Sequence, residues 1–574
     1  MALLVLAVDA RAQGESICTE GRIASIEIRS HRVFGESENG VMSKFYDAAN
    51  WLHVETRESV IRRELLFREG DCYEALRLEE SERLLRGFTF IQSASVEATR
   101  RRDGNYDVTV DTQDDWSLRI DPRLELGSGS PVAGITVAEQ NIVGTGKALE
   151  FLFITRPGRE DVGGAFFNPQ FLGSRWDAGA LAVRTEPGWV LRETLGYPFV
   201  GLVGRWAVFE DVLYGDRWFG YFVGDHEDRY ELVLPLRQVA VQFGGALRVM
   251  AAPRGRATKL GSYGLTLSYE RLDYGDAFPH DSATAAALNL SGEQAAALDD
   301  IVLKPRETVR LNLVMGIRGL DFVRKRGMST LQATEDIAIG ATADLVLGLA
   351  SRAFGSSDSH VLAALDLYGG SRIRGNWFSL LRANVEARRD YEARDWQDIF
   401  GAVQWTNIWQ LSPGRTIVLE GRWSAGRETS VPFQLTLGGP WGLAGFAPHR
   451  YPGGARAVVR LEDRFVLGSM GRLADVGVVA FVDGGRMWAN QALFGVNSGL
   501  RGSAGLGFIL ATPSGSPVSY RLQAALPIDH RTKLSDLVFA LRIEGPLRLE
   551  RAAVDPQLLR SRDSALPTAA RHLK

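Results

Sequence analysis

The sequence predicts a mainly β protein in which one small α/β domain precedes a large transmembrane antiparallel β-barrel. From residue 116 to residue 549, apolar and polar residues alternate in runs of about ten residues, which is typical of membrane-spanning strands. Before residue 116, segments with helical spacing stand between strand-like segments. No stretch approaches the roughly 20 consecutive apolar residues of a spanning helix, which excludes a helical membrane protein.

Length and composition restrict the alternatives. A single soluble core rarely exceeds about 250–300 residues, so a chain of 574 residues forms either several soluble domains or one large closed β-structure. The 13 Trp, 14 Tyr and 27 Phe exclude disorder for most of the chain. A net charge of −3 argues against nucleic acid as a partner.

The first residues indicate export. Residues 1–8 are apolar, and Ala10-Arg11-Ala12 has the small-x-small pattern of a cleaved signal peptide, although a basic segment before it is missing. We assign residues 1–21 to a signal peptide remnant and N-terminal segment. Cys18 and Cys72 can pair in an oxidising compartment, but two cysteines alone leave this open.

Residues 22–115 predict the small domain, with the order strand, helix, helix, strand, strand. The helices are expected over residues 57–67, with Thr56 as N-cap and Gly70 as the stop, and over residues 73–86, ended by Gly87. Strands are expected over residues 22–29, 90–98 and 106–110. We expect the strand at residues 90–98 to offer its edge to another extended chain.

Residues 116–549 predict the barrel. In one run, Val239, Val241 and Phe243 alternate with more polar residues such as Gln238 and Gln242. Soluble β-sandwiches would produce the same local pattern, but they would end after roughly 100–150 residues and show linkers. A barrel of this length is expected to hold about 16 strands.

This organisation resembles the BamA/TamA outer-membrane assembly superfamily (bacterial surface antigen type), whose periplasmic units are called POTRA domains. Two motifs near the C-terminus are the most specific: LGGPWGLAGF at residues 437–446 resembles the start of the family's inward-folded loop, and FVDGG at residues 481–485 resembles its Phe-x-Asp-x-Gly strand motif. Further resemblances lie at residues 61–70, 139–147, 167–169 and 195–198.

These motifs define the candidate site. Alternation places Phe481 and Asp483 on the luminal face, and it places Arg460, Glu462 and Arg464 on the luminal face of the preceding strand. A luminal carboxylate near several guanidinium groups could anchor a loop inside the barrel, although such charges also occur in any large barrel. The inward-loop motif comprises Gly438, Gly439, Leu443, Ala444, Gly445 and Phe446.

The chain departs from the family pattern at two places. Where relatives carry an Arg that pairs with the Phe-x-Asp carboxylate, this chain has Ala444, so the anchor is expected from Arg450 or Arg456, or the loop is held in another way. A polar tail, residues 550–574, also continues past the last strand, where family barrels usually end.

Enzyme signatures are absent from the sequence. The eight His residues are scattered without the spacing of a metal site, and no Gly-x-Ser-x-Gly motif is present. We therefore expect no catalysis, no metal and no cofactor.

The resemblance implies a bacterial outer-membrane barrel that assists insertion of outer-membrane proteins, or their translocation, by strand capture on the small periplasmic domain and lateral barrel opening. The alternatives are a two-partner-secretion transporter, which passes its client through the lumen, and a non-catalytic porin-like barrel. Implied partners are unfolded outer-membrane or secreted proteins, outer-membrane lipid and accessory lipoproteins.

Overall fold

The structure is a computed structural model, and it describes residues 18–34, 53–126, 132–156, 159–224, 230–250, 258–280, 303–439, 441–529, 532–545 and 555–562, with Thr284 and Ala286. Most of the predicted signal peptide therefore lies outside the described residues.

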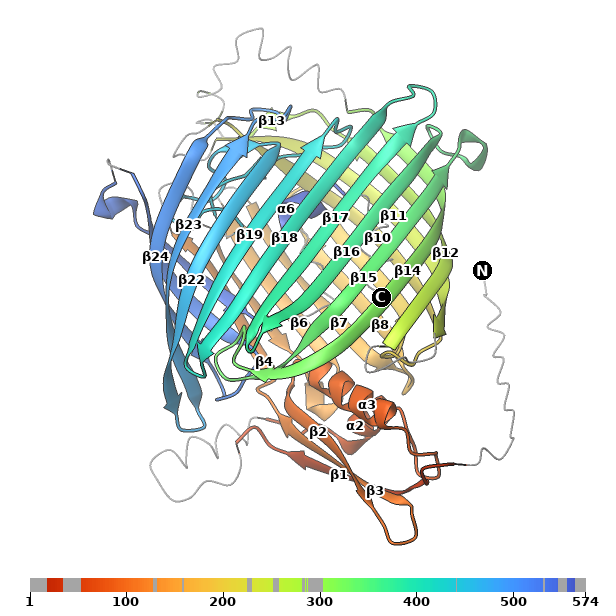
Figure 1. Ribbon diagram of the computed structural model, residues 1–574. Helices are drawn as coiled ribbons and strands as arrows, with labels where there is room; N and C mark the ends of the chain where they lie inside the picture. The colour runs from red at the N-terminus through yellow and green to blue at the C-terminus, as the bar shows by residue number, and fades with distance from the viewer. Residues whose placement is uncertain are drawn as a thin grey trace.

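A closed antiparallel barrel of 20 strands dominates the described part of the chain (Figure 1). Each strand pairs with its neighbours in sequence order, and β26 returns to pair with β4. The strands are β4 (Leu118–Leu126), β5 (Val132–Glu139), β6 (Ala148–Arg156), β7 (Arg159–Phe171), β8 (Trp176–Arg184), β9 (Trp189–Tyr197), β10 (Trp206–Phe222), β11 (Glu231–Met250), β12 (Thr258–Tyr274), β14 (Arg306–Arg326), β15 (Thr334–Ala350), β16 (His360–Arg374), β17 (Trp377–Asp390), β18 (Trp396–Ser412), β19 (Arg415–Arg427), β22 (Ala455–Met470), β23 (Ala474–Trp488), β24 (Gly499–Ala511), β25 (Ser519–Pro527) and β26 (Val538–Glu544), with a short addition at β13 (Phe278–Pro279).

The predicted count of about 16 strands is wrong. Many strands in the first part of the barrel are short: β4, β5, β6, β8 and β9 have only 8 or 9 residues. Strands this short carry few alternating positions, so they are harder to recognise in the sequence than β11 and β14, which have 20 and 21 residues.

The alternation predicted from the sequence separates the two faces of the wall. On neighbouring strands, Phe243 and Leu265 point outward with 51% and 56% of their surface exposed, whereas Gln242 and Thr266 are buried on the luminal face. An apolar outer face and a polar inner face are the arrangement of a barrel in a bilayer. Among the described residues, no helix has the length and apolar character needed to cross a membrane.

The small domain lies against one end of the barrel (Figure 1). It comprises β1 (Ile23–His31), α2 (Glu58–Glu64), α3 (Ala75–Gly87), β2 (Ile91–Arg100) and β3 (Tyr106–Asp114), in the predicted order. The sheet has the order β1-β3-β2, with β1 and β3 parallel. Its core packs apolar residues of both helices against the sheet, including Ile61, Leu78, Leu85, Val108 and Val110.

The prediction for the ends of α2 is wrong. The N-cap is Arg57, and α2 ends before Leu65 rather than at Gly70. Thr56 makes other contacts: its backbone N–H donates to Asp114 Oδ2 (2.8 Å), and its hydroxyl accepts from Asn141 Nδ2 (2.8 Å). Asn141 belongs to the β5–β6 connection, so Thr56 ties the domain to the barrel instead of capping a helix.

The β5–β6 connection and β7 hold one side of the domain. The Arg57 N–H donates to Gly144 O (2.9 Å), and a Cβ on Gly144 would lie 2.2 Å from Glu55 O, so the approach requires glycine. From β7, the Gln170 amide donates to Val60 O (3.0 Å) and to Glu64 Oε1 (2.7 Å) on α2.

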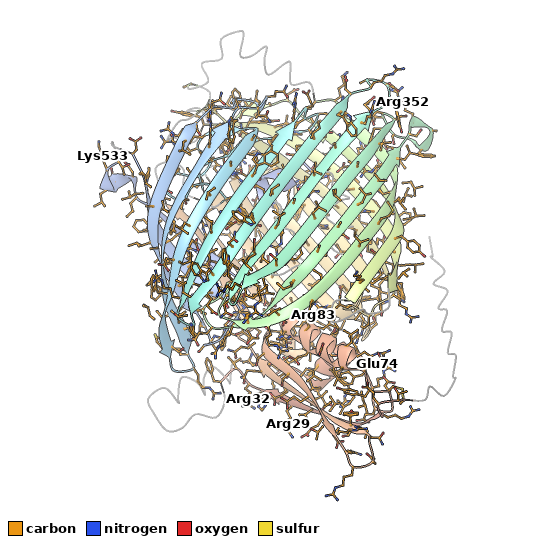
Figure 2. The ribbon with its side chains drawn as sticks, in the orientation of Figure 1. Arg29, Arg32, Glu74, Arg83, Arg352 and Lys533 are labelled. Carbon is orange, nitrogen blue, oxygen red and sulfur yellow. A yellow bond between two sulfur atoms is a disulfide. The ribbon has the colours of Figure 1, made fainter. Side chains whose placement is uncertain are left out.

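Other strands hold the opposite side of the domain. Arg86 of α3 pairs with Asp336 of β15 (2.8 Å). Arg83, which is labelled in Figure 2, lies over the ring of Phe322 in β14 (4.7 Å). The Ser516 hydroxyl donates to Asp115 Oδ2 (2.9 Å) beside the β24–β25 turn. The domain therefore contacts the rim on several sides and lies across this end of the barrel.

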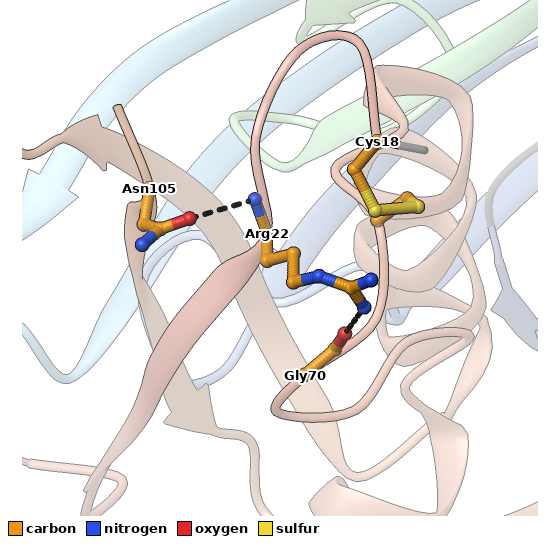
Figure 3. Close-up of a disulfide and its surroundings, with 5 residues drawn as sticks. Cys18, Arg22, Gly70 and Asn105 are labelled. Atoms are coloured by element: carbon orange, nitrogen blue, oxygen red, sulfur yellow. Dashed lines mark hydrogen bonds between the residues drawn. A yellow bond between two sulfur atoms is a disulfide. The ribbon is translucent and has the colours of Figure 1, made fainter. Parts of the chain in front are cut away.

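A disulfide joins Cys18 to Cys72 and resolves the pairing that the sequence left open (Figure 3). Beside it, Arg22 donates from Nη1 to Gly70 O (2.8 Å) and from its backbone N to Asn105 Oδ1 (3.1 Å). These bonds fix the start of β1 to the loop before α3 and to the turn between β2 and β3.

We predict that the double substitution Cys18→Ser/Cys72→Ser lowers the stability of the small domain by about 2–4 kcal/mol, because it frees a loop of 54 residues in the unfolded chain. Pulse proteolysis across a urea series should show cleavage of the small domain at lower urea. Reductant should lower the midpoint of the parent protein and leave the variant unchanged. An unchanged midpoint in the variant would contradict the prediction.

Candidate functional site

The connection between β19 and β22, residues 428–454, folds into the barrel lumen. Its Leu437 and Leu443 are fully buried and pack against wall residues such as Phe400 and Met487. A two-residue hairpin, β20 (Leu435–Thr436) with β21 (Pro452–Gly453), forms its stem. From this stem, the Gln434 amide donates to Phe222 O of β10 (3.0 Å), so the loop reaches strands that are remote in the wall order.

The predicted inward-loop motif forms the tight tip of this loop. The Leu443 N–H donates to Leu437 O (2.8 Å) and the Gly439 N–H to Phe446 O (3.2 Å). At Gly445, a Cβ would lie 2.6 Å from the Leu526 carbonyl carbon and from Ser503 Cβ. Only glycine allows this close approach to β24 and β25. Gly438 and Ala444 belong to the same turn.

Asp483 on β23 anchors the loop tip. It accepts from Arg460 Nη2 (2.7 Å), from the Ala444 N–H (3.2 Å) and from the Ser503 hydroxyl, and its side chain is fully buried. Ser503 Oγ also accepts from the Gly445 N–H (3.0 Å). The carboxylate thus binds both the wall and the loop backbone, and its charge strengthens these hydrogen bonds.

The remaining predicted luminal residues extend this cluster along the wall. Glu462 pairs with Arg464 (2.7 Å) and with Arg521 of β25 (3.0 Å). The ring of Phe481 lies 5.2 Å from the guanidinium of Arg460 and 5.3 Å from that of Arg521. The structure therefore brings together Phe481, Asp483, Arg460, Glu462 and Arg464, as the alternation placed them.

Sequence reasoning missed three members of this cluster: Ser503, Arg521 and Glu544, which pairs with Arg521 (3.2 Å). A signal for Arg521 existed, because it shares its polar parity with Ser519 and Gln523 in β25. No motif marks Ser503, which lies in a Gly-rich strand.

The expectation that Arg450 or Arg456 replaces the Arg missing at position 444 is wrong. Arg460 of the wall pairs with Asp483, and backbone N–H groups hold the loop. Ala444 packs against Phe481 and Ala525. Arg450 lies over the rings of Phe446 and Tyr451, while Arg456 donates to Thr436 O and to the C-terminal tail.

A second feature is the seam between β26 and β4, where the barrel closes. Among the described residues, three Cα pairs join these strands, from Phe539↔Leu126 to Leu541↔Leu124, whereas β25 and β26 pair continuously from Ser519 to Ala525. Toward the small domain, the pairing ends at Leu124 and does not reach Pro122, two positions farther along β4. Proline has no N–H to donate and is tolerated at a strand edge.

The predicted capture edge at residues 90–98 is largely occupied. β2 is an edge strand, but Ala94 O accepts from Arg86 Nη1 (3.2 Å) and the Val96 N–H donates to Glu82 Oε2 (3.2 Å). Both partners lie on α3, and Arg86 also binds the barrel at Asp336. The edge prediction is therefore wrong over the centre of this segment.

Fold and site together define a class: a β-barrel with an apolar outer wall, an α/β domain across one end and a loop anchored in the lumen. No protein-family model matches the sequence, and no curated protein matches it. Among the described residues, no group of three or more His, Cys, Asp or Glu side chains could hold a metal ion.

Several solved structures are similar to this chain. CdiB from Escherichia coli is 12% identical with a TM-score of 0.44, over 91% of this chain and 76% of that one. BamA from Haemophilus ducreyi lacking POTRA domains 1–3 is 14% identical with a TM-score of 0.34, over 92% and 84%. CdiB from Acinetobacter baumannii is 12% identical with a TM-score of 0.42, over 91% and 73%. At these identities and TM-scores, no activity follows from the likenesses.

We predict that Asp483→Asn releases the loop tip, because it leaves Arg460 without its buried counter-charge. Breaking one partner of such a pair costs about 3–5 kcal/mol. Limited trypsin digestion of the detergent-solubilised barrel should then cut at Arg450, which the parent protein protects.

The matched control is Asp463→Asn on β22, because Asp463 pairs with Arg415 at a more exposed position (2.7 Å). An exposed pair contributes about 0–1 kcal/mol, so this variant should digest like the parent. Equal protection in both variants would show that Asp483 does not anchor the loop.

Proposed function

We propose that this chain is a non-catalytic bacterial outer-membrane barrel that assists the insertion of outer-membrane proteins, or their translocation, and that it opens laterally at the β26–β4 seam. The observation that carries the proposal is the three-pair seam. In hydrocarbon each backbone group needs a partner, so the shortest ladder is the place where opening sacrifices the fewest hydrogen bonds.

The unpaired part of the seam supports the same proposal. Continuing the register past Leu541↔Leu124 would place Glu544 opposite Asp121, yet no pairing joins the strands there. This part of β4 follows Asp115 and Trp116 and lies beside the small domain. An extended client that arrives on the domain side would meet edges of β26 and β4 that are not paired with each other.

The wall is also low beside the seam. β4, β25 and β26 have 9, 9 and 7 residues, against 20 and 21 for β11 and β14. At about 3.3 Å per residue, strands this short cross less hydrocarbon than the opposite wall does. A bilayer thins to match a short wall, and a thinner bilayer lowers the barrier to inserting new strands.

The small domain is proposed to be a POTRA-like periplasmic unit. The Cys18–Cys72 disulfide is compatible with an oxidising periplasm, which supports a periplasmic position for the docked rim. Because Arg86 and Glu82 occupy the centre of the β2 edge, capture of an unfolded outer-membrane client would begin at the free end of β2, near Ala98 and Arg100.

A second candidate is two-partner secretion, in which a secreted client passes through the lumen. The observation that favours it is the loop at residues 428–454, which fills the passage such a client would need and would act as its plug.

We predict that a disulfide across the seam abolishes assembly. Leu124 and Leu541 are Cα partners, so Leu124→Cys/Leu541→Cys places two thiols at a distance a disulfide spans. In a strain depleted of the native protein, the oxidised variant should fail to restore the outer-membrane protein profile, and reductant should restore it.

The matched control is Leu265→Cys/Leu313→Cys, Cα partners on the opposite wall, treated with the same reductant. This pair should leave the profile normal. If the locked seam still supports assembly, lateral opening is wrong; if it blocks assembly but passes a secreted protein, the lumen is the route for secretion.

A further inference from the structure

The C-terminal tail enters the lumen. β26 runs toward the small domain, because it is antiparallel to β4, which starts there; the wall therefore ends at the domain-side rim with Glu544. Residues 555–562 nevertheless lie in the barrel interior near the other end, and their short helix α6 (Pro556–Leu559) appears inside the barrel outline in Figure 1.

Two buried ion pairs hold this segment at its ends. Asp555 pairs with Arg456 of β22, and Arg562 pairs with Glu386 of β17, and all four side chains are at most 5% exposed. β18 and β19 lie between these two strands. The segment therefore bridges the luminal face of the wall rather than following one strand.

Between the ion pairs, the segment contacts the stem of the inward loop. The Gln557 amide donates to Thr436 Oγ1 (2.7 Å), and its Oε1 accepts from the Thr436 N–H (3.0 Å). The Ser561 hydroxyl donates to Pro432 O. Leu558 is fully buried in the apolar cluster formed by Leu435, Leu437 and the wall. The tail thus completes the core that fixes the loop in the lumen.

The way the segment is held makes it separable from the barrel. In the described part of the tail, the backbone hydrogen bonds run only within the segment, from Leu559 to Asp555 and from Ser561 and Arg562 to Leu558. Side chains of the described residues 555–562 join it to the wall and the loop. The ring of strands closes without it through β26 and β4, so no ladder must break when the segment leaves.

We propose that residues 555–562 are a releasable plug that locks the loop at residues 428–454 in the closed lumen. When the segment leaves, the loop stem loses its contacts at Pro432 and Thr436. Its apolar cluster also loses the packing of Leu558. Water that enters then hydrates Arg456 and Glu386, which lowers the penalty of separating the ion pairs. This inference does not require the proposed role in assembly.

The test compares two adjacent leucines in the full-length protein. Leu558 is fully buried, whereas Leu559 is 39% exposed. Leu558→Asp removes the burial of one leucine and should raise the occupancy of open channels in planar lipid bilayers by about tenfold or more. Leu559→Asp adds the same charge at the adjacent, exposed position and should conduct like the parent.

Two truncations provide the second measurement. Ending the chain after residue 549 removes the segment and should open the lumen; ending it after residue 562 keeps every contact described above and should leave it closed. Folding is checked by heat-modifiable migration in gels. A folded barrel that stays closed without the segment would overturn the proposal. If neither Leu558→Asp nor the chain ending at 549 forms the folded barrel, the segment is a permanent part of the core and the proposal is equally wrong.

Discussion

Closure of the backbone ladder is the constraint on which the rest of this structure depends. A strand in hydrocarbon must pair on both sides, because lipid offers no partner to an N–H or C=O group. The chain satisfies this around the ring with long antiparallel ladders and does so least at β26 and β4, where pairing stops short of Pro122. Since proline cannot donate, extending the ladder there would gain less than it would elsewhere. The weak seam therefore follows from the sequence of β4.

Closure of the barrel has a second consequence, which concerns the charged residues in the lumen. Alternation that makes the outer wall apolar places Arg, Glu and Asp inside, where each needs a partner. Arg460 pairs with Asp483 and Arg521 pairs with Glu462, and Asp483 at the same time accepts from the backbone of the loop tip. All the strands that carry this anchor, β22 to β26, lie on the same side of the seam. Parting β26 from β4 would leave the anchor intact, so lateral opening and loop release are separable events.

The sequence predicts what depends on periodicity and fails where distant contacts decide. Alternation correctly places Phe481, Asp483 and Arg460, because the parity of a strand holds whatever its neighbours are. It does not count the short strands before β10. Thr56 has the residue type of an N-cap, yet a barrel residue, Asn141, takes its hydroxyl. Likewise, Arg456 has the charge to replace the Arg missing at position 444, but the tail residue Asp555 takes its guanidinium. The failures at Thr56 and Arg456 each involve a partner far away along the chain.

If the seam opens as proposed, the docked domain would determine how it parts. The domain is bonded to strands on both sides of the seam: through Gly144 to the β5–β6 connection, and through Gln92 and Asp115 to the β24–β25 turn at Ser514 and Ser516. These bonds tie the two edges together at the domain-side rim, where the strands themselves are unpaired, while the three ladder pairs hold them farther along the wall. Separation that breaks only the ladder would therefore widen away from the domain and pivot about it. In the proposed role, a client strand entering on the domain side would start at the narrow end of this opening, where β4 and β26 are not paired with each other. Only farther along the wall would its pairs replace those that the seam had given up.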